Sequence, residues 1–434
     1  MQLSFVGTGY VGLVSGTMMS HLGHEVICLD TDRNKVEKLK NKKIPIYEPG
    51  LTKYVEKHGN TKRLKFIYGY DASIKNSDCL FITVGTPPKE NGEADLNGIF
   101  EAVESASSYI NSECIIILKS TVLPGTCQQV KEFMQNKNKF FDIVSNPEFM
   151  REGNAIKDFL KPDRIVIGAH SERAFSVMRQ IYKPLTDRGI RLVETDLHTS
   201  ELIKYASNAF LANKIAFINE MADLCEIVGA DIDHLAKGIG LDKRIGEDFL
   251  RAGPGFGGSC FPKDILALQK LVNKRNSDFL ILDAVIQANN NRSNSMINKI
   301  STAIDGKLKH KKLAILGLTY KAETDDLRNS PVIKLIKQLQ KQGADVIAYD
   351  PKGMVNTGKY FEELNCADSI NSAIKGVNAI IIATEWSEFK DIDLGKTRKL
   401  VKTPIIIDLR NILVPKEVES EGFKYYSIGR ESGK

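Results

Sequence analysis

The first thirty residues contain the feature that most restricts the fold of this chain. Apolar residues 3–6 are followed by Gly7-Thr8-Gly9-Tyr10-Val11-Gly12, by a helical pattern to about residue 22, and by a second apolar segment. That segment ends at Asp30. A strand, a glycine turn, a helix, a strand and an acid in this order predict a Rossmann-like dinucleotide-binding domain.

Each position of this motif has a separate physical task. Gly7 allows the tight turn, Gly9 lets a pyrophosphate approach the backbone, and Gly12 allows close packing of helix and strand. Asp30 is placed to accept hydrogen bonds from the adenosine ribose, and its carboxylate would repel a 2′-phosphate. The sequence therefore predicts NAD rather than NADP as the cofactor.

Further parallel strands are predicted at residues 79–84, 114–119 and 141–145, and another at 165–168. Ligands of open α/β sheets bind beyond the carboxyl ends of the strands. Thr121 and Glu148 follow two of these strands and are candidate site residues on this ground. The alternative is that they serve only in turns and helix caps.

A long helical pattern occupies residues 200–228, and more helix is predicted through residues 231–251. A helix of nearly thirty residues suggests a spine that links domains or packs against a partner subunit. Lys204 and Asn208 are four residues apart, so they share one face of this helix. A solvated polar face is the alternative reading of that pair.

A glycine-rich segment, residues 253–264, contains Cys260 and leads into another helical pattern. Pro262 suits a first helical turn, which places Cys260 just before a helix N-terminus. The N–H groups and the dipole there favour an anion, so a lowered thiol pKa is expected for Cys260. The alternative is a small buried residue without chemistry.

After the charged junction at residues 310–312 the α/β pattern starts again, with strands at 313–316, 346–349, 379–383 and 405–408 and a helix at 331–342. Gly317-Leu318-Thr319 replaces the glycine triplet, which argues against a second dinucleotide held in the same way. Lys321, Arg328 and Arg410 follow strand ends and could meet phosphates, or they are surface charges. Three domains are predicted, at residues 1–196, 197–304 and 305–434.

The composition fits a soluble globular protein. Among 434 residues, Lys and Arg total 60 against 54 Asp and Glu, a surplus too small to predict nucleic-acid binding. Seven scattered cysteines do not form a disulfide pattern, which favours the reduced cytoplasm. No apolar run is long enough to cross a bilayer. We therefore expect a cytoplasmic protein with a small anionic ligand, no membrane partner and no metal site.

Together these motifs resemble the nucleotide-sugar dehydrogenases of the UDP-glucose/GDP-mannose dehydrogenase family over nearly the whole chain. The resemblance rests on the glycine turn, Ser120-Thr121-Val122, Asn146-Pro147-Glu148-Phe149, Lys204 with Asn208, residues 257–264, and Lys321. It implies two Rossmann-like domains joined by a central helical domain with a long spine helix. Phe261-Pro262-Lys263 is similar to the branch of the family that oxidises UDP-glucose.

The resemblance also implies an activity, which is a four-electron oxidation of a primary alcohol to a carboxylate with two NAD in succession. Cys260 captures the aldehyde and later carries a thioester. Lys204 and Asp264 handle protons, Lys204 and Asn208 stabilise charge on oxygen, and Glu148 with Thr121 activates or positions the hydrolytic water. A homodimer built on the long helix is also implied.

The remaining site residues implied by the resemblance form two groups. The expected cofactor contacts are Gly7, Gly9, Tyr10, Val11, Gly12, Asp30, Lys35, Thr86, Thr121, Glu152, Lys263 and Arg328. The expected substrate contacts are Glu148, Phe149, Met150, Arg151, Glu152, Lys204, Asn208, Phe249, Leu250, Arg251, Ala252, Gly253, Gly257, Lys321 and Arg410, with Arg244 supplied by the neighbouring subunit.

Three alternatives stay open on the sequence. The same chemistry could act on UDP-N-acetylmannosamine or GDP-mannose. A two-electron hydroxyacid dehydrogenase would leave Cys260 as a structural residue. A non-catalytic NAD-sensing protein would keep the glycine turn but gives no reason for Cys260, Asp264, Lys204 and Glu148 to occur together.

Overall fold

The computed structural model describes residues 1–431, and its chain divides into two compact units. The first unit contains Met1–Ser207 and Leu266–Arg275, and the second contains Asn208–Ile265 and the described residues from Asn276 onward. Two helices, α8 (Leu197–Val228) and α10 (Phe261–Lys274), have residues in both units.

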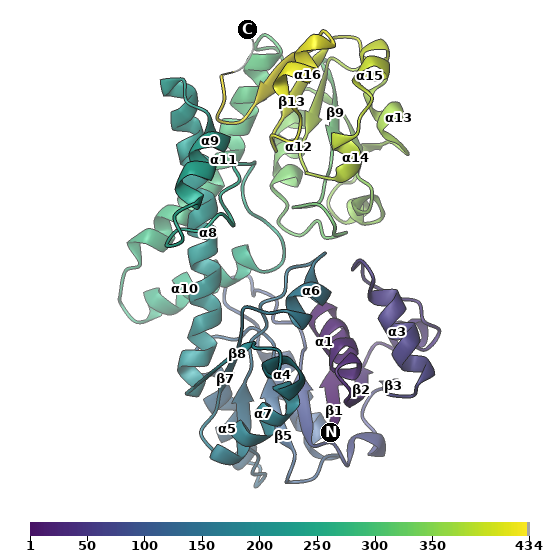
Figure 1. The fold of residues 1–434 in the computed structure, drawn as a ribbon, viewed down its shortest axis with the longest axis vertical. Helices are drawn as coiled ribbons and strands as arrows, with labels where there is room; N and C mark the ends of the chain where they lie inside the picture. The colour runs from purple at the N-terminus through teal and green to yellow at the C-terminus, as the bar shows by residue number, and fades with distance from the viewer. Residues whose placement is uncertain (432–434) are drawn as a thin grey trace. The chain divides into compact units, whose positions relative to one another are not determined.

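The first unit is built on an eight-stranded sheet in the order β3-β2-β1-β4-β5-β6-β7-β8 (Figure 1). All neighbouring strands pair in parallel except β6 and β7, which are antiparallel. The strands are β1 (Gln2–Val6), β2 (Glu25–Asp30), β3 (Leu64–Tyr68), β4 (Cys79–Ile82), β5 (Ile115–Leu118), β6 (Ile143–Ser145), β7 (Arg164–Gly168) and β8 (Arg191–Thr195).

Helices of the first unit connect these strands. They are α1 (Tyr10–His21), α2 (Arg33–Lys40), α3 (Leu51–Asn60), α4 (Asn97–Ser107), α5 (Thr126–Gln135), α6 (Ala155–Leu160) and α7 (Glu172–Thr186), with a 3-10 turn η1 (Ala72–Ile74). The strand order from β3 to β6 is that of a dinucleotide-binding Rossmann fold. Its crossover point lies at the carboxyl ends of β1 and β4, beside the glycine turn.

The second unit has a six-stranded, fully parallel sheet in the order β11-β10-β9-β12-β13-β14. It repeats the strand order of the first Rossmann sheet. The strands are β9 (Lys312–Leu316), β10 (Asp345–Tyr349), β11 (Asn365–Cys366), β12 (Ala379–Ile382), β13 (Ile405–Asp408) and β14 (Lys424–Ser427).

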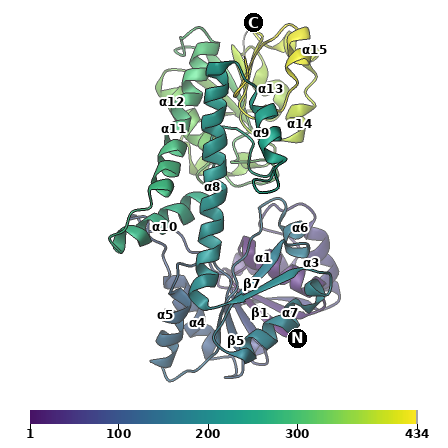
Figure 2. The same ribbon diagram turned by 60° about the vertical axis from the view of Figure 1, so that its left-hand side comes forward.

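Helices around this sheet complete the second unit. They are α9 (Ile232–Gly240), α11 (Leu280–Ala303), α12 (Pro331–Lys341), α13 (Ile370–Ile374), α14 (Ser387–Lys390), α15 (Leu394–Leu400) and α16 (Pro415–Ser420), with a 3-10 segment η2 (Gly353–Lys359). Helix α11 packs against α12 (Figure 2). The core joins apolar residues of α8 and α11, such as Ile218 and Ile300, to Ile315 of β9 and Ile336 of α12.

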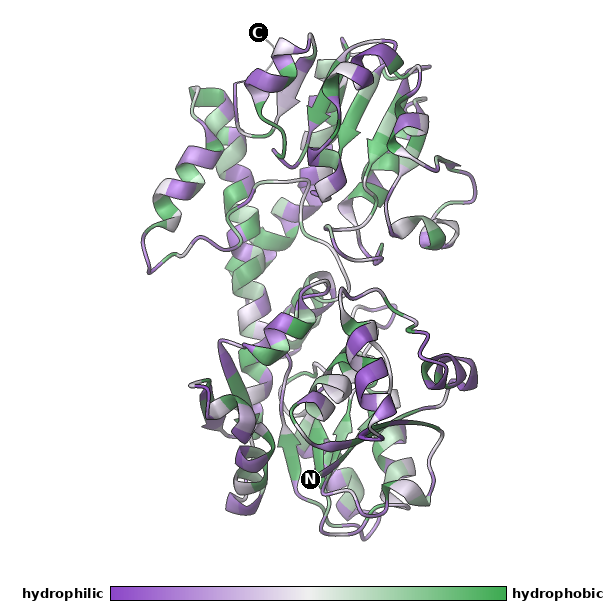
Figure 3. Cartoon of the chain, turned by 45° about the vertical axis from the view of Figure 1, so that its right-hand side comes forward, coloured by the Kyte–Doolittle hydropathy of each residue, from purple (hydrophilic) through white to green (hydrophobic). Residues whose placement is uncertain are grey.

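The central strands of both sheets are almost purely apolar, as the green strands of Figure 3 show. Helices on both faces bury such strands completely, so β4, β5 and β12 have every residue buried. This pattern explains why the sequence predicted these strands correctly. The predicted fold class, two Rossmann-like sheets and a central helical region with one long helix, is confirmed.

The helix predicted through residues 231–251 is wrong beyond Gly240. Helix α9 ends there, and residues 241–251 form turns. Arg244 N–H donates to the Asp242 side chain in a local turn, and Gly246 and Phe249 have φ of +73° and +66°. Local side-chain bonding and left-handed backbone both compete with helix, which apolar spacing alone does not reveal.

The edge strands β3, β8, β11 and β14 were not predicted. In β8 every residue is exposed or half-buried, and β11 has two exposed residues. Such strands lack the apolar run or strict alternation that marks a strand in sequence. The three-domain division stays a prediction.

Candidate active site

The glycine turn after β1 has the geometry of a pyrophosphate site. Gly7 has φ +95°, and a Cβ at Gly12 would lie 1.9 Å from the Gly7 carbonyl oxygen. Gly9 caps α1 without any side-chain hydrogen bond, and a Cβ built on it meets nothing within 4 Å. The N-terminal N–H groups of α1 are therefore open to an anion, and these residues fit a dinucleotide.

Asp30, at the end of β2, is held as a carboxylate. Its Oδ2 accepts from Thr8 N and Thr8 Oγ1, both at 2.7 Å, and pairs with Lys35 Nζ at 2.9 Å. Burial opposes ionisation, but hydrogen bonds from Asp32, Thr8 and Lys35 outweigh it and hold the pKa of Asp30 below its usual value. An ionised acceptor at this position suits ribose hydroxyls.

Other predicted cofactor residues lie at the same edge of the sheet. Tyr10 and Val11 form the first turn of α1 and are half-buried. The Tyr10 hydroxyl bonds the Glu48 carboxylate and accepts from Gly153 N at 2.9 Å, which ties α1 to the loop that contains Glu152. Thr86 Oγ1 donates to the Thr121 carbonyl at 3.0 Å, so the loops after β4 and β5 are joined.

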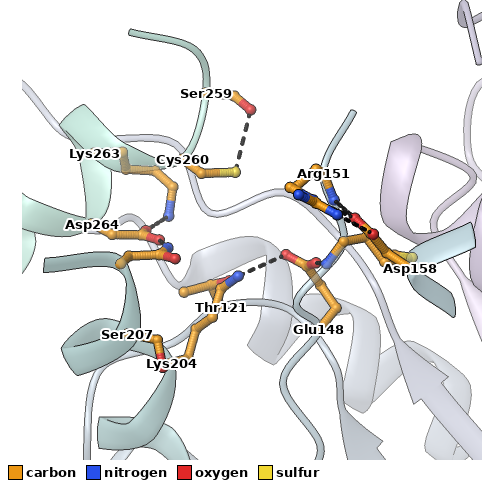
Figure 4. Close-up of polar contacts among 12 residues, drawn as sticks. Thr121, Glu148, Arg151, Asp158, Lys204, Ser207, Ser259, Cys260, Lys263 and Asp264 are labelled. Atoms are coloured by element: carbon orange, nitrogen blue, oxygen red, sulfur yellow. Dashed lines mark hydrogen bonds and ion pairs between the residues drawn. The ribbon is translucent and has the colours of Figure 1, made fainter. Parts of the chain in front are cut away.

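Glu148 and Lys204 form a buried ion pair in the first unit (Figure 4). Lys204 Nζ lies 3.2 Å from Glu148 Oε1, and both side chains are about 95% buried, with exposed fractions of 5% and 6%. Glu148 Oε2 accepts from Met150 N at 2.5 Å. Lys204 Nζ also lies 5.2 Å from the centre of the Phe149 ring.

The segment after Glu148 is fixed by polar contacts of its own. Arg151 makes bidentate hydrogen bonds to Asp158, from Nε at 3.0 Å and from Nη2 at 2.7 Å. Glu152 is buried. Arg164 stacks its guanidinium over Phe149, 3.6 Å from the ring centre. The predicted substrate residues 148–152 therefore form one ordered loop.

In the second unit the cysteine loop is anchored on both sides. Asn289 of α11 accepts from Phe256 N at 2.8 Å and donates to Phe256 O at 3.2 Å. Gly258 N donates to the Arg328 carbonyl at 3.0 Å. A Cβ at Gly257 would lie 2.3 Å from the Asn329 carbonyl oxygen, so the close approach requires glycine there.

Cys260 lies directly before α10, as predicted, and is half-buried. Its Sγ lies 3.5 Å from Ser259 Oγ (Figure 4). One turn later Asp264 is buried and accepts from Asn208 Nδ2 at 2.7 Å and from Lys263 Nζ at 2.6 Å. A thiol, a carboxylate, an amide and an ammonium thus gather at the start of α10, which is a suitable set for covalent catalysis with proton transfer.

Residues predicted to bind the nucleotide sugar surround the same loop. Gly253 N donates to Asn219 Oδ1 at 2.8 Å, and a Cβ at Gly253 would lie 2.8 Å from Arg410 Nη1. Arg410 donates to the Tyr320 carbonyl at 2.8 Å and pairs with Glu385 at 3.1 Å. Lys321, next to Tyr320, is half-buried.

The remaining predicted substrate and cofactor residues differ in exposure. In the segment 249–252, Leu250 and Ala252 are buried, while Arg251 is exposed. Arg328 is exposed and pairs with Asp326. The Arg244 side chain is 90% exposed and pairs with Asp242 of its own loop.

The turn after β9 repeats the chemistry of the first glycine turn. Leu318 N, Thr319 N and Thr319 Oγ1 all donate to Asp350 Oδ2, as Thr8 does to Asp30. A Cβ at Gly317 would lie 1.8 Å from Thr384 Oγ1. The second sheet therefore has the turn of a nucleotide-binding fold without the later glycines.

The structure groups the predicted residues by unit. Glu148, Thr121, Lys204 and the glycine turn belong to the first unit, whereas Cys260, Asp264, Asn208 and Arg410 belong to the second. Helix α8 carries both Lys204 and Asn208, one turn apart on the same face.

Three further polar residues were not singled out from the sequence. Lys119, Asn146 and Tyr182 form a buried hydrogen-bonded group beside Glu148. The sequence offered one signal for this group, a lysine directly after the apolar run 115–118. A lysine is unusual at the end of a buried strand, because charged side chains are seldom buried.

The described residues, 1–431, contain neither a helix that could span a membrane nor a cluster of metal-ligating side chains.

A glycine turn fitted to NAD in one Rossmann sheet and a cysteine beside proton-transfer groups in the other unit define the class of an NAD-binding oxidoreductase. The family models agree with this class. Residues 1–186 match the NAD binding domain, residues 198–291 the central domain, and residues 314–415 the UDP binding domain of the UDP-glucose/GDP-mannose dehydrogenase family. The chain belongs to this family, and its cofactor is NAD.

Relatives agree over the full length. The chain is 56% identical over 432 residues to a UDP-glucose 6-dehydrogenase of Rickettsia bellii, covering 99% of each chain, and 46% identical over 435 residues to one of Rhizobium meliloti, covering 99% and 100%. A solved UDP-glucose dehydrogenase from Pyrobaculum islandicum has a TM-score of 0.90 at 34% identity, covering 99% of this chain and 98% of the other. A UDP-D-ManNAc dehydrogenase from Pyrococcus horikoshii has a TM-score of 0.86 at 26% identity, with 99% of each chain covered.

Proposed function

We propose that this chain oxidises UDP-glucose to UDP-glucuronate in two successive oxidations, with Cys260 holding the sugar between them. The observation that carries the proposal is the thiol of Cys260 at the start of α10, in an anchored glycine loop and one turn before Asp264. The overall balance is one alcohol, two NAD⁺ and one water giving one carboxylate, two NADH and three protons.

Bound NAD accepts the hydride in each of the two oxidations. In the first oxidation Lys204 and Asp264 handle the proton that leaves the sugar hydroxyl, directly or through a water molecule. Lys204 and Asn208 stabilise the negative charge that develops on this oxygen. The carbon that becomes an aldehyde stays at the site because the Cys260 sulfur adds to it and forms a thiohemiacetal.

The second oxidation converts the thiohemiacetal to a thioester, which water must cleave. We assign this hydrolysis to Glu148 and Thr121. The Glu148 carboxylate takes a proton from the water as its oxygen attacks the carbonyl carbon, and the C–S bond then breaks to release the Cys260 thiolate. The Lys204–Glu148 ion pair supports this assignment, because it keeps an ionised acceptor in a buried place.

UDP-glucose is the substrate we propose among the nucleotide sugars of the family. The support is the full-length identity to UDP-glucose 6-dehydrogenases and the Phe261-Pro262-Lys263 segment at the start of α10. Arg410 and Lys321, beside the cysteine loop, supply positive charge for the diphosphate. The second candidate is the same oxidation of UDP-N-acetylmannosamine, favoured only by the structural similarity to a UDP-D-ManNAc dehydrogenase.

We also propose that the enzyme works as a homodimer in the cytoplasm. Phe210, Phe217 and Leu224 follow one another at intervals of seven residues on α8. Their exposed fractions are 65%, 49% and 45% respectively. Such an apolar stripe on one helix face suits packing against the same helix of a second copy. Arg244, whose side chain is exposed, would then reach the substrate bound by the partner. All seven cysteines of the chain are free, which suits a reducing compartment.

A substrate comparison tests the proposed reaction. Purified protein with excess NAD is expected to form two NADH for each UDP-glucose consumed, with no aldehyde released into solution. Its kcat/KM for UDP-glucose should exceed that for UDP-N-acetylmannosamine and GDP-mannose by at least about tenfold, because contacts to the sugar hydroxyls discriminate strongly. One NADH per sugar, or a better rate with another nucleotide sugar, would contradict the proposal.

A further inference from the structure

Lys119 directly follows β5 and places an ammonium group inside the first unit. The residue is 4% exposed. Its Nζ donates to Asn146 Oδ1 at 3.1 Å and to the Tyr182 hydroxyl at 3.4 Å. Both partners are neutral, and no carboxylate of residues 1–431 forms an ion pair with it. A buried charge with only neutral partners lowers stability, so its presence suggests a functional role.

The hydrogen bond between Lys119 and Asn146 connects the two loops to which we assign the hydrolysis. Lys119 is two residues before Thr121, and Asn146 is two residues before Glu148. Asn146 is itself fixed, because its N–H donates to the Leu118 carbonyl at 2.9 Å and its side-chain amide to the Val166 carbonyl at 2.8 Å. The lysine therefore braces the spacing between the Thr121 loop and the Glu148 loop.

The charge of Lys119 also acts on its surroundings. Burial lowers the pKa of Lys119 to about 8, Glu148 raises it and Lys204 lowers it further. Tyr182 is neutral, and burial raises its pKa. At pH values below about 8 the buried group thus contains the ammonium of Lys119 in addition to the Lys204–Glu148 ion pair.

A cavity of about 40 Å³ joins these groups. Lys119, Asn146, Glu148 and Tyr182 contribute to its wall, and the charged side chains of Asp158 and Arg164 also line it. Asp158 is bonded to Arg151, and Arg164 lies over Phe149. The volume is enough for about two or three water molecules. An ammonium has three N–H donors, and the described protein groups use two of those on Lys119.

We propose that Lys119 is a positioning residue for the hydrolysis of the thioester, which it serves by bracing the Thr121 and Glu148 loops and by adding positive charge beside Glu148. The proposal rests on the function proposed above. In the step concerned, the water oxygen bonds to the thioester carbon, the C–S bond breaks, and the water proton passes to Glu148. No electrons are exchanged. The added positive charge favours the anionic tetrahedral intermediate over the neutral thioester.

Lys119→Met tests the proposal, because methionine fills a similar volume without charge. The Tyr182 hydroxyl still donates to Asn146 Oδ1 at 2.6 Å, so each of these two side chains keeps one hydrogen-bond partner. The folded-state pKa of Lys119 lies below the unfolded value, so its charge lowers stability at pH values below about 8, and this effect disappears as the pH approaches the unfolded value. We therefore expect the Tm of the variant at pH 7 to equal or exceed that of the wild type, with the difference shrinking toward pH 10.

The kinetic arm uses single turnover with excess NAD, followed by NADH absorbance and by the mass of the denatured protein. In Lys119→Met the two hydride transfers should proceed at nearly wild-type rates, while hydrolysis slows roughly 10- to 100-fold and the acyl form of Cys260 accumulates. Wild-type hydrolysis should fall as pH rises through about 8, where Lys119 loses its proton. The variant should be slow and flat across this range.

Tyr182→Phe is the matched control, because it removes the hydrogen bonds of the Tyr182 hydroxyl to Asn146 Oδ1 and to Lys119 Nζ but leaves the ammonium and its bond to Asn146. It should retain the fall in rate near pH 8. Hydrolysis at the wild-type rate in Lys119→Met would overturn the proposal. A variant with a lower Tm in which both hydride transfers and the hydrolysis slow equally would overturn it as well. If the wild type forms no acyl-enzyme from UDP-glucose, the proposed function and the role of Lys119 both fail. If the wild type does form the acyl-enzyme and Lys119→Met hydrolyses it at the wild-type rate, the role of Lys119 fails and the proposed function stands.

Discussion

At the scale of single residues, the ion pair of the candidate site differs from ion pairs on the surface because both of its side chains are buried. Lys204 and Glu148 are both almost fully buried, while Lys183 and Asp187 on α7 form an ion pair with 68% and 58% exposure. A buried carboxylate that loses its cation is left in a medium of low polarity. An exposed carboxylate that loses its cation is simply solvated by water.

Lys204→Met should therefore lower the free energy of unfolding by about 3 kcal/mol. Lys183→Met, the control at an exposed pair, should change it by less than about 1 kcal/mol. Urea denaturation at pH 7 measures both values. The double variant Lys204→Met/Glu148→Gln should recover part of the loss, because the unpaired carboxylate is gone. Equal effects of the two single variants would show that burial of the pair does not matter.

The sequence predicted the residues with distinctive local motifs but not those defined by tertiary contacts. Cys260 before a helix and Asp30 at the end of a strand can be placed from the local pattern of glycine, proline and apolar residues. The buried setting of Lys119 could not be predicted, because its hydrogen-bond partners Asn146 and Tyr182 are 27 and 63 residues away in the chain. The pairing of Asp264 with Lys263 and Asn208 likewise required the structure.

At the scale of elements, helix α8 combines buried polar positions with exposed apolar ones. Its polar positions Lys204 and Asn208 bond Glu148 and Asp264, and its apolar positions Phe210, Phe217 and Leu224 are exposed. Helical periodicity predicted this element over nearly its full length, since apolar residues recur at the 3.6-residue period. The same periodicity failed after Gly240, where turn-forming side chains and left-handed residues end the helix.

The exposed stripe gives a prediction about assembly. Phe217→Asp places a carboxylate at the centre of the stripe, and burying it against a second copy would be costly, so the protein should become monomeric. Sedimentation velocity measures the change. Val355→Asp, at a position that is 92% exposed, is the control and should leave the assembly unchanged. A wild type that sediments as a monomer, or a dimer that survives Phe217→Asp, would contradict the proposed interface.

At the scale of the whole molecule, two Rossmann sheets with the same strand order have separate tasks. The first has the three glycines and Asp30 that fit NAD. In the second sheet Thr319 donates to Asp350, as Thr8 does to Asp30 in the first, but the later glycines are missing. This sheet instead carries Arg410 and Lys321 near the cysteine loop. The order of elements along the chain was enough to predict the central strands of both sheets, because apolar strands alternate with helices in each half, but not the edge strands β3, β8, β11 and β14.

The central claim is that Cys260 holds the substrate covalently through the second oxidation. The most direct measurement is the mass of the Cys260 peptide after an acid quench during turnover with UDP-glucose and NAD. Wild type and especially Glu148→Gln should carry a hydroxylamine-sensitive acyl adduct on Cys260, and Cys366→Ala, a change at an exposed cysteine, should behave like wild type. Absence of the adduct from both proteins, with Cys260→Ala still forming two NADH per sugar, would contradict the account.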